Sequence, residues 1–203
     1  MPTGVAIRDV REQLFDAAER VLVRDGPSAL TSRAVTTEAG CAKGVLHRHF
    51  ADFDAFLAEL TGDRIARLDG QAAALRESAG TGTVAGNLTG VLISLFGSVA
   101  VAIISLITFR DGLRARLRQT TPHGVPLLTE AAAMLASYLA VERDLGRIAP
   151  GADVDTLAPT LLGAAHLLFA DRKGPPPEAG AVHKVVTTVI AGVVPGDQTR
   201  GVS

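Results

Sequence analysis

Apolar residues along this chain recur every three or four positions, which is the spacing of one face of an α-helix. The first such run begins after Arg11 and consists of Leu14, Ala17, Ala18, Val21 and Leu22. Gly26 follows this run, and glycine readily adopts the left-handed conformation that ends many helices. The pattern therefore predicts a first helix that ends just before Gly26.

Two shorter helices are predicted next. Thr31 is a suitable N-cap, and Leu30 before it can pack against Val35 as a hydrophobic staple. Gly40 ends this helix after about two turns, and a third helix is expected from Lys43 to about Phe50. Short helices joined by a tight glycine turn are typical of a helix-turn-helix unit.

The predicted third helix has two faces of opposite character. Leu46 and Phe50 are one turn apart and are expected to face the other two helices. The opposite face is exposed and carries Lys43, Gly44, His47 and Arg48. Arg and Lys pair with guanine edges, an apolar side chain such as Val45 contacts thymine methyl groups, and a glycine allows close approach of the backbone. This face suits a helix that reads the major groove of DNA.

The rest of the chain predicts further helices. Asp52 caps a helix that runs to about Ser78, and a glycine-rich loop and two apolar helices follow it. Hydrophobicity falls after Arg110, and a turn is expected near residues 122–124. Later helices are predicted over 125–146, from Asp153 or Asp155 to about residue 171, and over 179–194, with a loop at 174–180.

Two of these segments allow a second interpretation. Residues 78–109 contain no charged side chain and are long enough to span a bilayer, but the pair Gly97-Ser98 predicts a break into two buried core helices, which we favour. The last segment is rich in β-branched residues, which favours a strand. Its apolar positions nevertheless follow helical spacing, so we expect a helix.

The predicted helices indicate an all-α fold, and composition supports a globular protein of the cytoplasm. The chain of 203 residues is 47% hydrophobic and 20% charged, with a net charge of −1. Its single cysteine, Cys41, excludes an internal disulfide framework and fits a reducing compartment. No long apolar run follows the N-terminus, so no signal peptide is expected.

Metal binding and catalysis are the main rival interpretations of these residues. His47 and His49 are two positions apart on a helix and face different directions, so we expect no metal site and no cofactor. The chain lacks a phosphate loop, a dinucleotide fingerprint and a nucleophile elbow, which argues against an enzyme. A solvated helix face remains the plainest alternative for Lys43, His47 and Arg48.

The segment LTSRAVTTEAGCAKGVLHRHF resembles the DNA-binding signature of the tetracycline-repressor (TetR) family of transcriptional regulators. The resemblance implies a helix-turn-helix domain over 1–51 and a larger helical effector-binding and dimerisation domain over 52–203, bridged by the helix at 52–78. It also implies that DNA is contacted by Thr31, Ser32, Arg33, Lys43, Gly44, Val45, His47, Arg48 and His49.

Several positions depart from the family pattern. Ala42, Val45 and His47 replace the usual serine, threonine and tyrosine, and Phe53 stands where relatives often carry a lysine that holds a phosphate. Residues 1–60 contain seven Arg or Lys against nine Asp or Glu, so the predicted reading domain has no basic excess. Phosphate contacts supply much of the binding free energy, and these departures therefore predict weakened DNA affinity.

The same resemblance implies a homodimer on a palindromic operator, formed by the helices at about 155–171 and 179–194, and a small hydrophobic effector that releases the DNA. No membrane partner is expected. The residues proposed to line the effector pocket are Phe96, Ile103, Thr108, Phe109, His123, Leu135, Tyr138, His166 and Phe169. Each of them could instead simply fill the core.

Two other functions remain open from the sequence. The first is a DNA-binding protein of this fold that organises the nucleoid or activates transcription without a small ligand. The second is a degenerate relative that acts through protein contacts or as an enzyme, as the altered residues Ala42, Val45 and Phe53 would permit.

Overall fold

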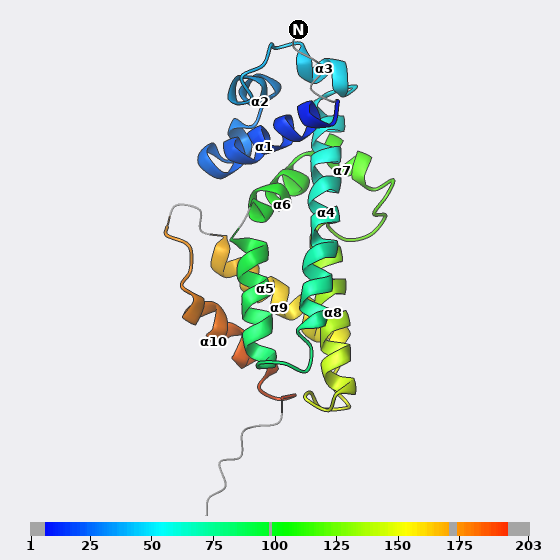
Figure 1. The fold of residues 1–203 in the computed structure, drawn as a ribbon, viewed down its shortest axis with the longest axis vertical. Helices are drawn as coiled ribbons and strands as arrows, with labels where there is room; N and C mark the ends of the chain where they lie inside the picture. Colours follow the sequence, from blue (N-terminus) through cyan, green and yellow to red (C-terminus); the bar gives the residue numbers. More distant parts are fainter. Residues whose placement is uncertain (1–6, 98, 171–173, 195–203) are drawn as a thin grey trace, which may run out of the picture. The chain divides into compact units, whose positions relative to one another are not determined.

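The computed structural model describes residues 7–97, 99–170 and 174–194, with side chains from residue 10 onwards, and every regular element in this part of the chain is helical (Figure 1). The predicted all-α fold is therefore confirmed. The elements are α1 (Ile7–Asp25), the 3₁₀ helix η1 (Pro27–Ala29), α2 (Ser32–Glu38), α3 (Val45–His49), α4 (Phe53–Glu77), α5 (Val84–Phe96), α6 (Ala100–Phe109), α7 (Asp111–Leu117), α8 (Leu128–Asp144), α9 (Val154–Phe169) and α10 (Ala179–Ile190).

The helices form two compact units. The first unit combines residues 1–65 with 98–127, and the second combines 66–97 with 128–203. Helix α4 begins in the first unit and ends in the second. The first unit therefore contains more than the reading domain predicted at 1–51, because α6 and α7 belong to it as well.

The core of the first unit is built on α1. All five apolar positions predicted for the inner face of α1 are buried, and α1 packs against α2, η1 and α6. Three aromatic rings gather beside it: Phe15 lies 5.9 Å from Phe50 and 5.6 Å from Phe56, and Phe50 meets Phe56 edge-on at 5.0 Å. Aromatic pairs at these separations add to the hydrophobic stabilisation of a core. They tie the end of α3 to α1 and α4.

The predicted start of α2 is confirmed in detail. The Thr31 hydroxyl accepts a hydrogen bond from the backbone N–H of Ala34 at 3.1 Å, and the staple residues Leu30 and Val35 are both buried. Gly40 has a φ of +66°, in the left-handed region that favours glycine. The turn between α2 and α3 thus depends on this glycine.

Helix α3 is shorter than predicted. It begins at Val45 rather than Lys43, and Lys43 and Gly44 form the turn before it. The physical reason is a missing cap: Ala42 has no side-chain oxygen, and the N-cap position is Gly44, which makes no side-chain hydrogen bond. Leu46 and Phe50 are buried as predicted.

The start of α4 was predicted correctly, but α7 was not predicted. Asp52 caps α4, since its carboxylate accepts a hydrogen bond from the backbone N–H of Ala55 at 2.7 Å. Helix α7 forms in the segment that loses hydrophobicity after Arg110. Its two leucines, Leu113 and Leu117, are one turn apart and both buried, which is enough to anchor seven residues in a tertiary context.

The second unit is a group of packed helices. Helices α5, α9 and α10 lie against one another, and α8 packs on α9 (Figure 1). Apolar side chains of all four helices are buried between them, including Leu92, Leu139, Leu161 and Val186.

The apolar stretch is divided as predicted. Helix α5 ends at Phe96, and the Gly97 N–H bonds to the Ile93 carbonyl at 2.8 Å; Ser98 lies outside the described residues. No single helix in the described part of the chain is long and apolar enough to cross a membrane, and only α5 and α6 taken together reach that length and composition.

A buried polar network joins α8 to the loop between α4 and α5. Glu142 is fully buried; its carboxylate accepts a hydrogen bond from the Tyr138 hydroxyl at 2.6 Å and pairs with Arg147 at 3.3 Å. Arg147 also donates to the Gly82 carbonyl at 2.6 Å, and Asn87 donates to the Tyr138 hydroxyl at 3.0 Å. Burial and the adjoining carboxylate raise the pKa of Tyr138 above its usual value. The phenol therefore stays protonated and keeps donating to Glu142.

The structure also decides how the last two helices begin and end. Asp153, not Asp155, is the N-cap of α9, and its side chain accepts from the Thr156 N–H at 3.1 Å. The last segment is a helix, as its spacing predicted, but α10 ends at Ile190 rather than residue 194. Gly192 is a poor helix former and accounts for the early end.

Candidate nucleic-acid interface

Helix α3 presents the side chains that the sequence assigned to DNA reading. His47 and Arg48 on α3 are exposed, as are Lys43 and Gly44 in the turn before it. Val45 and His49 are partly buried. Because Leu46 and Phe50 anchor the opposite side of α3, the exposed face has a fixed orientation on the unit.

Helix α2 contributes a second exposed edge. Thr31 and Arg33 are exposed and Ser32 is partly buried. Thr31 uses its oxygen as the helix cap, which leaves its hydroxyl hydrogen available to donate. Arg33 lies one turn from Thr36, whose hydroxyl is buried against the backbone carbonyls of Ser32 and Arg33.

Polar side chains of α1, which sequence reasoning missed, hold both reading helices at their ends. Arg11 donates from Nη1 to the His49 carbonyl at 3.1 Å, and its guanidinium lies 4.4 Å from the centre of the Phe50 ring. Gln13 donates to the Ala39 carbonyl, at the end of α2, at 2.8 Å. These long side chains satisfy carbonyls that a helix end leaves unpaired.

An ion-pair group fixes α2 to α1. Glu38 at the end of α2 binds Arg20 at 2.8 Å and Arg24 at 2.9 Å, both from α1. These two guanidinium groups hold the pKa of the Glu38 carboxyl below its usual range. The one acidic side chain within the reading helices is therefore neutralised inside the unit.

Two arginines beyond α6 lie at the start of α4, directly after α3. Arg110 forms an ion pair with Asp54, and its guanidinium lies 5.2 Å from the centre of the Phe53 ring. Arg116 of α7 binds the Asp52 carboxylate at 2.7 Å. Sequence reasoning missed both contacts, although the dense run of arginines at 110–118 was a visible signal.

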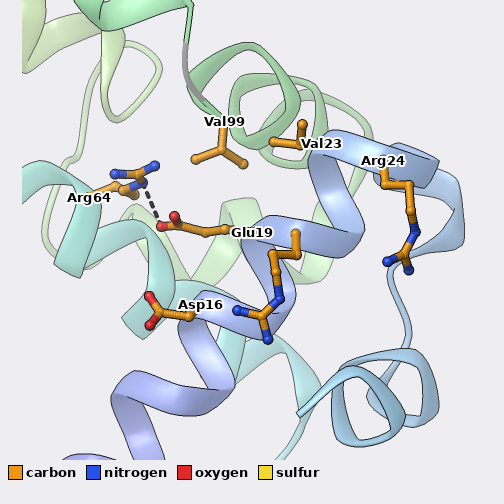
Figure 2. A pocket seen from close by; sticks show the side chains of 7 residues that line it. Asp16, Glu19, Val23, Arg24, Arg64 and Val99 are labelled. Atoms are coloured by element: carbon orange, nitrogen blue, oxygen red, sulfur yellow. Dashed lines mark ion pairs between the residues drawn. The ribbon is translucent and has the colours of Figure 1, made fainter.

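An open cleft of about 600 Å³ lies between α1 and α4 within the first unit. Figure 2 shows Glu19 of α1 and Arg64 of α4 joined across it at 2.7 Å, with Asp16, Val23, Arg24 and Val99 around them. Most of its lining side chains are charged. Such a cleft does not suit a hydrophobic effector, because burying charged groups under an apolar ligand is costly.

The residues predicted to bind an effector fall into both units. Ile103, Thr108, Phe109 and His123 belong to the first unit, whereas Phe96, Leu135, Tyr138, His166 and Phe169 belong to the second. Ile103, Leu135 and Tyr138 are buried in the core, while Thr108, Phe109 and His123 are exposed. The structure brings together Phe96, His166 and Phe169, whose rings lie within 6 Å of one another in two pairs.

One mostly apolar groove of about 380 Å³ includes a predicted ligand residue. It lies between α8 and α9 and is lined by Leu128, Thr129 and Ala132 on one side and by Pro159, Leu162, Gly163 and His166 on the other. Burial lowers the pKa of His166, which favours its neutral form. A neutral imidazole offers one donor and one acceptor in an otherwise apolar site.

Among the described residues, no group of three or more His, Cys, Asp or Glu side chains is placed to hold a metal ion. Cys41 is a free, partly buried thiol in the turn between α2 and α3.

The geometry defines a class of protein. A buried hydrophobic anchor, a glycine turn and an exposed Lys, His and Arg face on a short second helix are the features of a helix-turn-helix DNA-binding domain. In agreement, residues 14–60 match the sequence profile of bacterial regulatory proteins of the tetR family. The family match covers this N-terminal region, and the fold of the described chain resembles that of solved TetR-family regulators. No curated protein sequence matches the chain.

Solved structures show the same fold along nearly the whole chain. A TetR-family regulator from Agrobacterium tumefaciens has a TM-score of 0.70 at 12% identity, covering 93% of this chain and 99% of its own. A TetR regulator from Haloarcula marismortui has a TM-score of 0.68 at 17% identity, covering 93% and 100%. The regulator FadR of Bacillus subtilis, solved with stearoyl-CoA, has a TM-score of 0.65 at 19% identity, covering 89% and 98%.

Proposed function

We propose that this protein is a homodimeric transcriptional repressor, acting in the cytoplasm, that binds a palindromic operator and is released by a small hydrophobic effector. In this proposal residues 1–51 read DNA and residues 52–203 bind the effector and the second subunit. The observation that carries it is the exposed face of Lys43, Gly44, His47 and Arg48, anchored from behind by Leu46 and Phe50. Because residues 14–60 match the profile of a family of regulators, we propose regulation rather than catalysis.

The DNA contacts are assigned to the two reading helices. Arg48 and Lys43 are exposed and able to pair with guanine edges, Val45 supplies an apolar contact and Gly44 allows the backbone to approach. Thr31, Ser32, Arg33, His47 and His49 are assigned to phosphates or to neighbouring bases. Within the described residues, Arg48 and Lys43 make no side-chain hydrogen bond or ion pair and are exposed, so both are available to DNA.

The dimer interface is assigned to α9 and α10. From Thr156 to Phe169, α9 carries no Asp, Glu, Lys or Arg, and its outer face includes Thr160, Gly163, Ala164 and the largely exposed Leu167. A charge-free helix face that remains exposed on one subunit is typical of an interface. A twofold dimer places two reading helices about one DNA turn apart, which fits a palindromic site.

The effector is assigned to the second unit and is expected to be mainly apolar. The groove between α8 and α9, with His166 beside Phe96 and Phe169, offers an apolar surface with one polar handle. One neighbour of the same fold was solved with stearoyl-CoA, which makes an acyl-CoA a sensible first probe.

Selection from a random duplex DNA pool at near-physiological salt tests the proposal. Wild-type protein is expected to enrich an inverted repeat, and Arg48→Ala, which removes one exposed guanidinium, is expected to lose that enrichment. Stearoyl-CoA added to the purified complex is expected to reduce binding. Failure of the wild-type protein to enrich any sequence would overturn the assignment of the reading helices.

A further inference from the structure

The net charge of the first unit becomes positive only through residues outside the reading helices. Residues 1–65 contain eight Arg or Lys and ten Asp or Glu, whereas residues 98–127 contain four arginines and one aspartate. Residues 98–127 therefore change the net charge of the unit from −2 to +1. DNA binding requires positive potential near the phosphates, and these arginines add to the cations of the reading helices.

These arginines lie close to the C-terminal end of the recognition helix. Arg116 contacts Asp52, two residues beyond Phe50, where α3 has ended. Arg110 covers the ring of Phe53, the first residue of α4. Both guanidinium groups thus lie beside the short connection between α3 and α4.

That connection is expected to face the DNA backbone. Helix α3 has five residues and is about 7.5 Å long, shorter than the width of the major groove, about 12 Å. The chain that leaves α3 therefore reaches the edge of the groove within a few residues. Phosphates line that edge, so a cation beside the start of α4 is within reach of one.

We propose that α7 provides a second DNA-backbone contact, in which Arg116 binds a phosphate at the C-terminal end of α3 and Asp52 competes for the same guanidinium. This inference rests on the DNA-binding function proposed above. Arg116 and Asp52 have side chains about 41% and 52% exposed, and exposed pairs of this kind contribute little free energy. Arg116 can therefore exchange the Asp52 carboxylate for a phosphate at little cost in free energy.

Arg110 has a different role from Arg116. Its partner Asp54 is less exposed than Asp52, the partner of Arg116. The Arg110 guanidinium also lies over the Phe53 ring, and Phe53 stacks on Phe56 at 5.6 Å. Arg110 is thus held from two sides and acts as a positioning residue that keeps α7 beside α4. Arg116 is the arginine free to move to a phosphate.

The substitution Asp52→Asn gives the sharpest test. Asparagine caps a helix as well as aspartate does, so α4 keeps its start while the competing charge is removed. Operator binding is expected to become about two- to fivefold tighter, in line with the strength of an exposed ion pair. If the Asp52–Arg116 pair instead positions the reading head, Asp52→Asn weakens binding, and the proposal is wrong.

The complementary measurement is the salt dependence of binding for Arg116→Ala. Loss of one phosphate contact is expected to weaken binding about threefold at physiological salt and to lower the slope of log K against log salt by about 0.9 for each subunit. Arg76→Ala is the matched control: it removes an exposed arginine from the second unit and is expected to leave the slope unchanged.

Arg116→Glu separates folding from binding. Its thermal unfolding is expected to remain close to that of the wild type, because the replaced pair is exposed, while its operator affinity falls further than in Arg116→Ala. An unchanged slope in both Arg116 variants, alongside a clear loss in Arg48→Ala, would reject the α7 contact and leave the proposed function intact. If the wild-type protein bound no DNA selectively and no variant changed that binding, both the α7 contact and the proposed function would be rejected.

Discussion

Gly40 and Gly44 show how two glycines four residues apart serve different purposes. Gly40 has a φ of +66°, which an L side chain rarely adopts, whereas Gly44 has a φ of −81°, which any residue accepts. A Cβ at either position would meet no atom within 4 Å. The first glycine is thus needed for the turn, and the second is open to solvent with nothing in the fold that requires it.

These positions give a matched pair of predictions. Gly40→Ala is expected to destabilise the protein by about 1 kcal/mol, because alanine pays the cost of a left-handed backbone. Gly44→Ala is expected to leave stability equal to or slightly above that of the wild type, but to weaken operator binding, because a methyl group would hold the backbone away from DNA. Urea unfolding and a binding titration on both variants measure the two effects. If Gly44→Ala and the wild type bound DNA with equal affinity, the backbone at Gly44 would not approach the DNA closely.

At the scale of the element, the C-terminal end of α8 is held by charge rather than by apolar packing alone. Glu142 is fully buried, yet it receives hydrogen bonds from Tyr138 and the Gly80 N–H, and an ion pair from Arg147. A buried carboxylate is tolerated only when donors of this kind surround it. The loop between α4 and α5 is ordered against α8 by the same contacts.

Removing one member of the network should therefore be costly. Arg147→Met is expected to lower the free energy of unfolding by about 2 kcal/mol, because it leaves the Glu142 charge short of a partner. This loss is smaller than expected for a fully buried ion pair, because the Arg147 side chain is about one quarter exposed and water can partly solvate the Glu142 charge in its place.

Two further variants check the cause of this loss. Adding Glu142→Gln to Arg147→Met is expected to recover part of the stability, because the double variant has no buried charge to satisfy. Arg143→Met serves as the control, since Arg143 donates to one neutral carbonyl, that of Ala152, at 3.2 Å. Urea denaturation of all three variants gives the comparison. Similar losses in the two arginine variants would contradict the role given to Glu142.

At the scale of the whole molecule, DNA binding is expected to depend on association of two chains. One reading unit offers a small exposed basic face, and a twofold dimer doubles the number of phosphate contacts. Leu167 is 76% exposed on the charge-free side of α9, which makes it the natural place to disturb the interface.

Leu167→Glu is expected to shift the protein from dimer to monomer, because it places a charge in an apolar contact. Analytical ultracentrifugation measures the change, and operator binding should fall with it. Leu145→Glu is the control, since Leu145 is also an exposed leucine but lies at the end of α8, outside the assigned interface. A dimeric Leu167→Glu protein would contradict the assignment of α9.

The helix-turn-helix region and the order of most helices could be predicted from the sequence alone. Those features depend on local patterns: apolar spacing in α1, the Thr31 cap, the Gly40 turn and the one-turn separation of Leu46 and Phe50. In α10 the helical spacing of apolar residues predicted the observed helix, although its β-branched residues favour a strand. Local chemistry of this kind acts between residues a few positions apart, so it can be recognised along the chain.

Contacts between residues far apart in the sequence could be known only from the folded structure. Helix α7 forms because Leu113 and Leu117 find a core to enter, and Arg116 reaches Asp52 across 64 positions of sequence. Glu142 is satisfied by the Gly80 N–H, 62 positions away. The energy of these contacts comes from burial and from partners supplied by other helices. The spacing of residues within one segment does not reveal such contacts. The arginines that neutralise Glu38 and the arginine proposed to add a phosphate contact are therefore identified only in the folded molecule.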